Sequence, residues 1–112
     1  MAFTDLTTAE ETAIAEFRKR LQDRFGERFV LMKLFGSVAC GERWAESDLD
    51  LLVLIQDVSW EEKRWVWDTA TDANISHDTM LSPFVTTPQE FQVLRDRELR
   101  IATDIDREGI LL

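Results

Sequence analysis

Two short segments of this sequence have the residue types and spacing to handle phosphates and a metal ion. Gly36-Ser37 is followed, after ten intervening residues, by Asp48-Leu49-Asp50. On a β-strand, positions i and i+2 point to the same face, so Asp48 and Asp50 would present two carboxylates side by side. Two adjacent anions raise each other's pKa unless a cation compensates. Mg²⁺ commonly binds through one or two carboxylates together with substrate phosphates, so this pair predicts a metal site for phosphoryl transfer.

Gly36-Ser37 predicts the phosphate-binding half of the same site. Gly36 follows an apolar segment and precedes a short helical turn expected at 38–41, with a loop continuing to Ser47. A glycine lets the backbone approach a phosphate closely. The amides at the start of the turn, with the Ser37 hydroxyl, can donate hydrogen bonds to phosphate oxygens. If the strands before Gly36 and after Asp48 are neighbours, both halves of the site lie at one end of the sheet.

The elements that must position these residues alternate between helical and strand patterns. This order predicts an α/β (or α+β) fold with a mixed central sheet flanked by helices, which we expect on one side of the sheet. The chain of 112 residues has the length of one domain, expected over 1–112. Helices are expected at about 9–24, 60–72, 88 onward and 99–107, and strands at 29–35, 49–55, 79–86 and 110–112.

Caps set several of these boundaries. Thr8 with Glu11 forms a capping box for the first helix, with Thr7 and Glu10 as the alternative register, and Gly26 closes that helix. The second helix should open at a Ser59 and Glu62 capping box, and the third at Thr87-Pro88-Gln89-Glu90.

Strand periodicity assigns faces to side chains. Alternation over 29–35 predicts one face with Phe29, Leu31, Lys33 and Phe35 and the other with Val30, Met32 and Leu34. Pro83 cannot donate a ladder hydrogen bond, which predicts an edge position or a bulge for the third strand.

Three tryptophans fall on the second expected helix. Helical spacing places Trp60 and Trp67 on one face and Trp65 elsewhere. One interpretation is packing against the sheet, and the other is a patch that binds a partner protein.

The two segments also carry a family resemblance. Residues 36–41 (GSVACG), followed by 47–53 (SDLDLLV), closely resemble the signature of the minimal nucleotidyltransferases (MNT) of the DNA polymerase β-like superfamily. The ending at 105–110 (IDREGI) also looks like the C-terminus of that family, so the resemblance extends over most of the chain. Many members of the family are paired with HEPN-domain proteins in toxin–antitoxin modules.

The resemblance implies a function. It implies that Gly36 and Ser37 hold a nucleoside triphosphate, ATP in the first place, and that Asp48 and Asp50 bind Mg²⁺ in a two-metal site. The implied reaction moves AMP from ATP onto an acceptor hydroxyl, which can belong to a partner protein such as a HEPN toxin. The alternative is a catalytically weak or inactive antitoxin that neutralises its HEPN-family toxin by binding.

Two positions depart from the family pattern. The family usually has an arginine where this chain has Cys40, and Arg43 is the nearby alternative cation. In the family, a third carboxylate on a later strand completes the metal site. Asp78 is the acidic residue closest to the expected strand and the candidate for this catalytic role, although alignment of that strand places Ser82 or Phe84 nearer the expected position.

Composition restricts the partners. The net charge of −9 repels nucleic-acid phosphates, so direct nucleic-acid binding is not expected. No apolar run approaches the ~20 residues that span a bilayer, which predicts no membrane association. The acidic N-terminus lacks an apolar segment and Cys40 has no internal disulfide partner, so a cytoplasmic location is expected. The sequence leaves the oligomeric state open.

Overall fold

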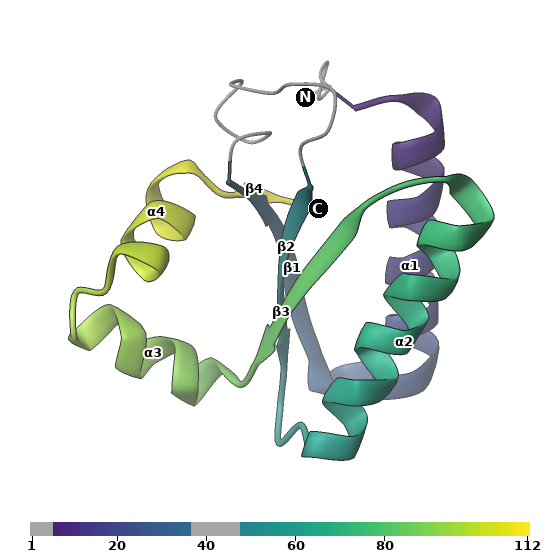
Figure 1. Cartoon of the computed structure of the whole chain (residues 1–112). Helices are drawn as coiled ribbons and strands as arrows, with labels where there is room; N and C mark the ends of the chain where they lie inside the picture. Colours follow the sequence, from purple (N-terminus) through teal and green to yellow (C-terminus); the bar gives the residue numbers. More distant parts are fainter. Residues whose placement is uncertain (1–5, 37–47) are drawn as a thin grey trace.

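A computed structural model of the chain describes residues 6–36 and 48–112 (Figure 1). The predicted turn at 38–41 and the loop to Ser47 lie outside these residues. The elements, in chain order, are α1 (Thr8–Phe25), the 3₁₀ turn η1 (Gly26–Arg28), β1 (Phe29–Phe35), β2 (Leu49–Ile55), α2 (Trp60–His77), β3 (Leu81–Thr86), α3 (Pro88–Asp96), α4 (Arg100–Glu108) and β4 (Ile110–Leu111). In the described part of the chain, no helix is long and apolar enough to cross a membrane.

The four described strands form a mixed sheet in the order β3-β2-β1-β4. β1 is antiparallel to β2 and β4, whereas β2 is parallel to β3. The prediction of a mixed sheet is therefore confirmed. β3 lies at an edge, as Pro83 predicted.

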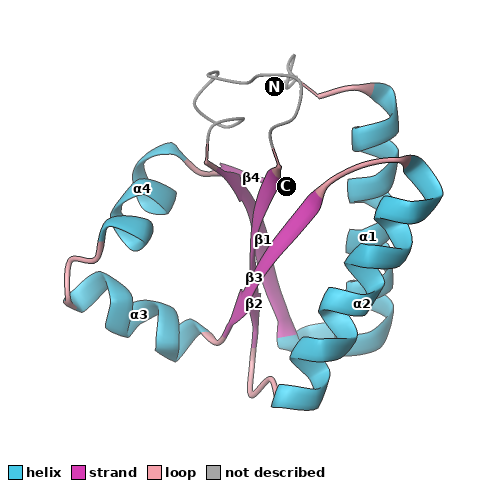
Figure 2. Cartoon of the chain, in the orientation of Figure 1, coloured by secondary structure: helices cyan, strands magenta, loops and turns pink. Residues whose placement is uncertain are grey.

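Helices cover both faces of the sheet, which corrects the expectation of helices on one side. In Figure 2, α1 and α2 lie against one face and α3 and α4 against the other. The reason is β2, which is apolar on both faces after Asp50. Leu49, Leu51, Val53 and Ile55 enter the core under α1 and α2, whereas Leu52 and Leu54 pack with Phe91, Ala102 and Ile105 under α3 and α4.

The helix ends follow their caps. The alternative register of α1 is correct: the Thr7 Oγ1 atom accepts from the Glu10 amide at 3.1 Å, and the Glu10 carboxylate accepts from the Thr7 amide at 2.9 Å. The Thr8 and Glu11 register is therefore wrong. The predicted capping boxes of α2 and α3 and the stop at Gly26 are confirmed. α2 continues past the predicted end at residue 72, because its C-cap is Asp78 in the left-handed conformation (φ 55°).

A bulge in β1 changes one predicted face. The β1–β2 register shifts between Phe29 and Leu31. Because one extra residue reverses the alternation of side chains, Phe29 is buried with Met32 and Leu34 under α1 and α2. Leu31 packs on the opposite face. The prediction that placed Phe29 with Leu31 is wrong for this reason, whereas the alternation over 31–35 holds.

The open edge of β3 is covered by an amide side chain. Asn74, on α2, accepts from the Leu81 amide at 2.7 Å and donates to the Leu81 carbonyl at 3.1 Å. Its Oδ1 atom also accepts from the Thr79 hydroxyl at 3.0 Å. The side chain therefore pairs with Leu81 as the backbone of another strand would. Two residues further along β3, Pro83 has no backbone N–H that could pair with another strand. Both features protect the edge from pairing with another chain.

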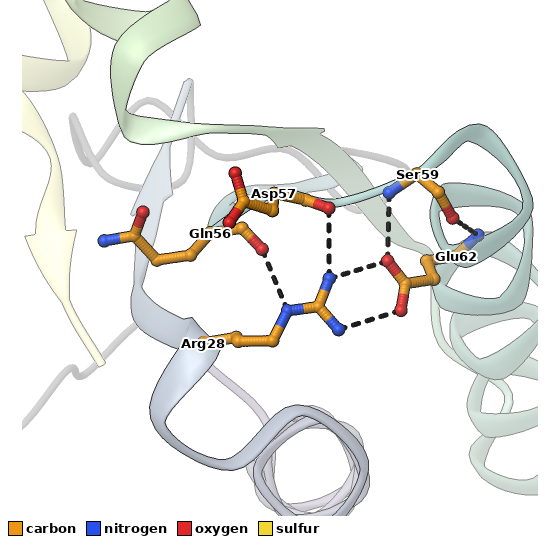
Figure 3. A network of polar contacts seen from close by, with 5 residues as sticks. All are labelled: Arg28, Gln56, Asp57, Ser59 and Glu62. Carbon is orange, nitrogen blue, oxygen red and sulfur yellow. Dashed lines mark hydrogen bonds and ion pairs between the residues drawn. The ribbon is translucent and has the colours of Figure 1, made fainter.

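Arg28 fastens the end of the sheet opposite Asp50 (Figure 3). Its guanidinium donates to both carboxylate oxygens of Glu62, at 2.9 and 2.7 Å, and to the carbonyls of Gln56 and Asp57, at 3.0 and 3.1 Å. Glu62 also completes the cap of α2 by accepting from the Ser59 amide at 2.9 Å. The hydrogen bonds from Arg28, followed by the one from Ser59, lower the pKa of Glu62 to about 2. One side-chain pair thus joins η1, the turn after β2 and the start of α2.

We predict that Asn74→Ala lowers the free energy of unfolding by about 1–3 kcal/mol, the cost of leaving buried hydrogen-bonding groups without partners. Leu81 is 5% exposed, so water cannot replace the lost amide. The measurement is urea denaturation followed by circular dichroism. Ser76→Ala, at an exposed position of the same helix, is the matched control and should leave the midpoint unchanged. Equal midpoints for the Asn74 variant and the control would contradict the role of Asn74.

We predict a pH-dependent cost for Glu62→Gln. A carboxyl whose pKa is lowered by folding adds stability above its unfolded pKa of about 4.5, and this stability is lost as the pH falls toward about 2. Wild type should therefore exceed Glu62→Gln in denaturation midpoint at pH 6, and the two midpoints should converge between pH 4.5 and 2. A difference that stays constant over this range would show that the ion pair with Arg28 does not carry it.

Candidate active site

The end of β1 and the start of β2 bring Gly36 into contact with Asp50. Asp50 pairs with Phe35 in the antiparallel register, so the residue after Phe35 lies beside its side chain. A Cβ atom on Gly36 would stand 2.3 Å from the Asp50 Oδ2 atom. Gly36 also has a φ of +83°, which side chains rarely adopt. Both the space beside Asp50 and the backbone conformation therefore require glycine here.

Asp50 lies on the face of the sheet that α3 and α4 cover. Its neighbours Leu49 and Leu51 are fully buried on the opposite face, so Asp50 points the other way. Burial, followed by repulsion from the nearby Asp48, raises the pKa of Asp50 above its usual value. Asp48 itself is exposed. The two carboxylates are thus close enough to repel each other, and a cation would relieve this repulsion.

Ser82 is the residue of β3 beside Asp50. The parallel register pairs Asp50 with Ser82 and Leu52 with Phe84. Paired residues of neighbouring strands point to the same face, and Ser82 is exposed there, whereas Phe84 packs under α3 and α4. Of the positions considered for a third carboxylate, the strand register therefore brings Ser82 next to Asp50.

Asp78 lies before β3, four residues ahead of Ser82. It is the exposed C-cap of α2, and its amide donates to the Asn74 carbonyl. Within residues 6–36 and 48–112, no group of three His, Cys, Asp or Glu side chains is placed to hold a metal ion. The neighbouring His77 contacts Glu16 on α1.

The donor set at Asp48 and Asp50 fits a hard divalent cation. Both side chains offer carboxylate oxygens, which Mg²⁺ prefers, and a bound cation would offset the burial and the charge of Asp48 that raise the pKa of Asp50. Because Gly36 has no side chain, nothing from this position collides with the Asp50 carboxylate. Ser37, Cys40 and Arg43, the other residues singled out for phosphate binding, lie outside the described part of the chain.

Trp60 and Trp67 share an exposed face of α2, as helical spacing predicted. Their rings meet edge to face at 5.4 Å, and the residues are 62% and 37% exposed. Trp65 lies elsewhere, packed edge to face on Phe25 at 5.7 Å with the Arg24 guanidinium 4.6 Å from its ring. The exposed pair keeps open the interpretation of a surface for a partner protein.

Comparisons with known proteins identify the family. The family described as Polymerase beta, Nucleotidyltransferase matches residues 18–112. Two relatives from Methanocaldococcus jannaschii, each named "Putative protein adenylyltransferase", are 30% identical over 73 residues and 32% identical over 82 residues. The matches cover 64% and 73% of this chain and 74% and 78% of those proteins.

Solved structures share the fold. A toxin–antitoxin complex with AMP-PNP superposes with a TM-score of 0.57 at 20% identity, covering 85% of this chain and 68% of the other. A point mutant of the MntA–HpeT toxin–antitoxin superposes with a TM-score of 0.57 at 22% identity, covering 91% of this chain and 70% of the other.

We predict that Gly36→Ala costs about 1–3 kcal/mol of stability through its left-handed backbone and its collision with Asp50. The second contribution can be isolated with a double-mutant cycle. In an Asp50→Ala background the collision disappears, so the same glycine substitution should cost less. Urea denaturation of the four proteins measures the coupling. An identical cost in both backgrounds would contradict the contact between Gly36 and Asp50.

Proposed function

This chain belongs to the polymerase β nucleotidyltransferase family as a minimal, MNT-type member, and on that premise we propose that it transfers AMP from ATP to an acceptor hydroxyl. The observation that carries the proposal is the contact of the Asp50 carboxylate with Gly36 at the end of β1. It joins the predicted phosphate-binding segment to the predicted metal ligands in one place. The exposed Asp48 lies close enough to raise the pKa of Asp50.

The proposed roles follow from the donors. Gly36 leaves the backbone open for the triphosphate, and the Ser37 hydroxyl donates to its oxygens. Asp48 and Asp50 hold Mg²⁺. When bound, this ion neutralises phosphate charge and stabilises the in-line transition state. Because Asp50 is partly removed from water, its charge interacts more strongly than that of a fully solvated carboxylate.

We propose a protein as the acceptor. The relatives from Methanocaldococcus are named for adenylyl transfer to protein, and the solved neighbours are toxin–antitoxin complexes. A HEPN-domain toxin encoded with this chain is the partner that the family resemblance implies. Complex formation with such a partner would bring the acceptor hydroxyl to the site, because a domain of this size has little surface with which to enclose an acceptor.

A second candidate function is neutralisation of that toxin by binding, with little or no transfer. Two observations favour it. The residue of β3 that pairs with Asp50 is the neutral Ser82, and a carboxylate at this position would add a third metal ligand. Trp60 and Trp67, in edge-to-face contact, offer exposed aromatic area on α2, a feature common at protein interfaces.

We predict that label passes from α-³²P-ATP to protein in the presence of Mg²⁺ and the co-encoded partner. Asp48→Ala and Asp50→Ala should each lower this transfer at least about a hundredfold, because each removes charge stabilisation of the transition state. Asp68→Ala, which removes an exposed acid on α2, is the matched control and should transfer at the wild-type rate.

The same samples test the second candidate. Absence of transfer, together with a stable complex that survives Asp48→Ala and Asp50→Ala, would refute the enzyme and support neutralisation by binding. In that case Trp60→Ala and Trp67→Ala should weaken the complex in size-exclusion chromatography.

A further inference from the structure

The inference concerns Ser82, and it rests on the proposed function. Three strands present one residue each at the same level of the sheet, because Phe35 pairs with Asp50 and Asp50 pairs with Ser82. Gly36 follows Phe35. The phosphate-binding glycine and Ser82 therefore flank Asp50 from opposite sides, one on the β1 side and the other on the β3 side.

In the transfer reaction, the leaving group and the acceptor would lie on different sides of Asp50. In an in-line displacement the attacking oxygen and the leaving group lie on opposite sides of the phosphorus. If Gly36 holds the departing pyrophosphate, the acceptor oxygen arrives from the β3 side. The bond from this oxygen to the α-phosphorus forms, and the α-phosphorus bond to the bridging oxygen breaks. Pyrophosphate leaves with that electron pair, and the acceptor proton passes to solvent.

We propose that Ser82 is the acceptor-side residue of the site, where the acceptor hydroxyl enters, and that its neutral side chain leaves metal binding on this side incomplete. Ser82 is exposed, and its hydroxyl makes no hydrogen bond with the described residues, so it is accessible to an incoming group. A serine hydroxyl is a neutral, weak ligand for a divalent cation, whereas a carboxylate beside Asp50 would add charge and a third oxygen ligand.

Metal affinity tests this directly, without any turnover. Mn²⁺ is titrated into the protein with the non-hydrolysable analogue AMP-PNP, and free Mn²⁺ is followed by electron paramagnetic resonance. Ser82→Asp should bind Mn²⁺ about tenfold or more tightly than wild type, an effect comparable to those of other residues that support metal sites. Ser82→Asn places a neutral side chain of the size of aspartate at this position, and it should bind Mn²⁺ as wild type does. Equal affinities for Ser82→Asp and Ser82→Asn would overturn the proposal.

Transfer to the partner protein tests the entry side. Ser82→Asp should raise the transfer rate. Ser82→Phe should abolish transfer while leaving the affinity for Mn²⁺ and AMP-PNP unchanged, because its bulk lies on the β3 side and away from Gly36. Wild-type transfer by Ser82→Phe would overturn the proposal.

Failure of the proposed function has a different signature. Asp50→Asn should lose binding of Mn²⁺ with AMP-PNP. If this variant binds both as wild type does, Asp50 does not hold the metal nucleotide and the proposed function fails, whatever happens at Ser82. Thermal unfolding of each variant confirms that it is folded, which the exposed position of Ser82 should allow.

Discussion

The constraint on which the site depends is a carboxylate partly removed from water at the end of an apolar sheet. Asp50 interrupts a strand whose other residues, Leu49 and 51–55, are all buried. Burial and the charge of Asp48 both oppose its ionisation. The contact with Gly36 is possible only because that residue has no side chain. Local features that oppose stability in this way are typical of functional positions, where the rest of the fold must compensate.

The two helical layers provide that compensation unequally. The α1/α2 layer buries the larger cluster and is fastened by Arg28 at the end of the sheet remote from Asp50. The α3/α4 layer covers a smaller cluster, on the face that carries Asp50. Its two helices are joined by Arg95, which donates to both oxygens of Asp106 at 2.8 and 2.9 Å and lies 4.6 Å from the ring of Phe91. The hydrogen bonds from Arg95 lower the pKa of Asp106, and the pair holds the two helices together.

Most of the local structure follows from the sequence, apart from the cap register of α1 and the end of α2, whereas details of strand pairing and helix packing do not. The bounds of β1 and β2 and the capping boxes at Ser59 and Thr87 depend on neighbouring residues, so periodicity and composition were sufficient. The bulge near Val30 and the second helical layer depend on how strands pair and on what covers them, which no local pattern encodes. The same limit applies to the site. The adjacency of Asp48 and Asp50 follows from strand alternation, whereas the contact of Gly36 with Asp50 and the pairing of Asp50 with Ser82 exist only through the register of three strands.

This division by strands has a consequence for how the activity can change. The proposed nucleotide half of the site depends on the antiparallel pair β1 and β2, which lies in the middle of the sheet between the two helical layers. The proposed acceptor half depends on β3, an edge strand whose outer side is already protected by Asn74 and Pro83. Ser82 is exposed and its hydroxyl makes no hydrogen bond with the described residues, so a substitution there leaves the core and the protected edge of the sheet intact. On the proposed function, such a domain can retain nucleotide binding while a substitution on β3 strengthens or abolishes its transfer.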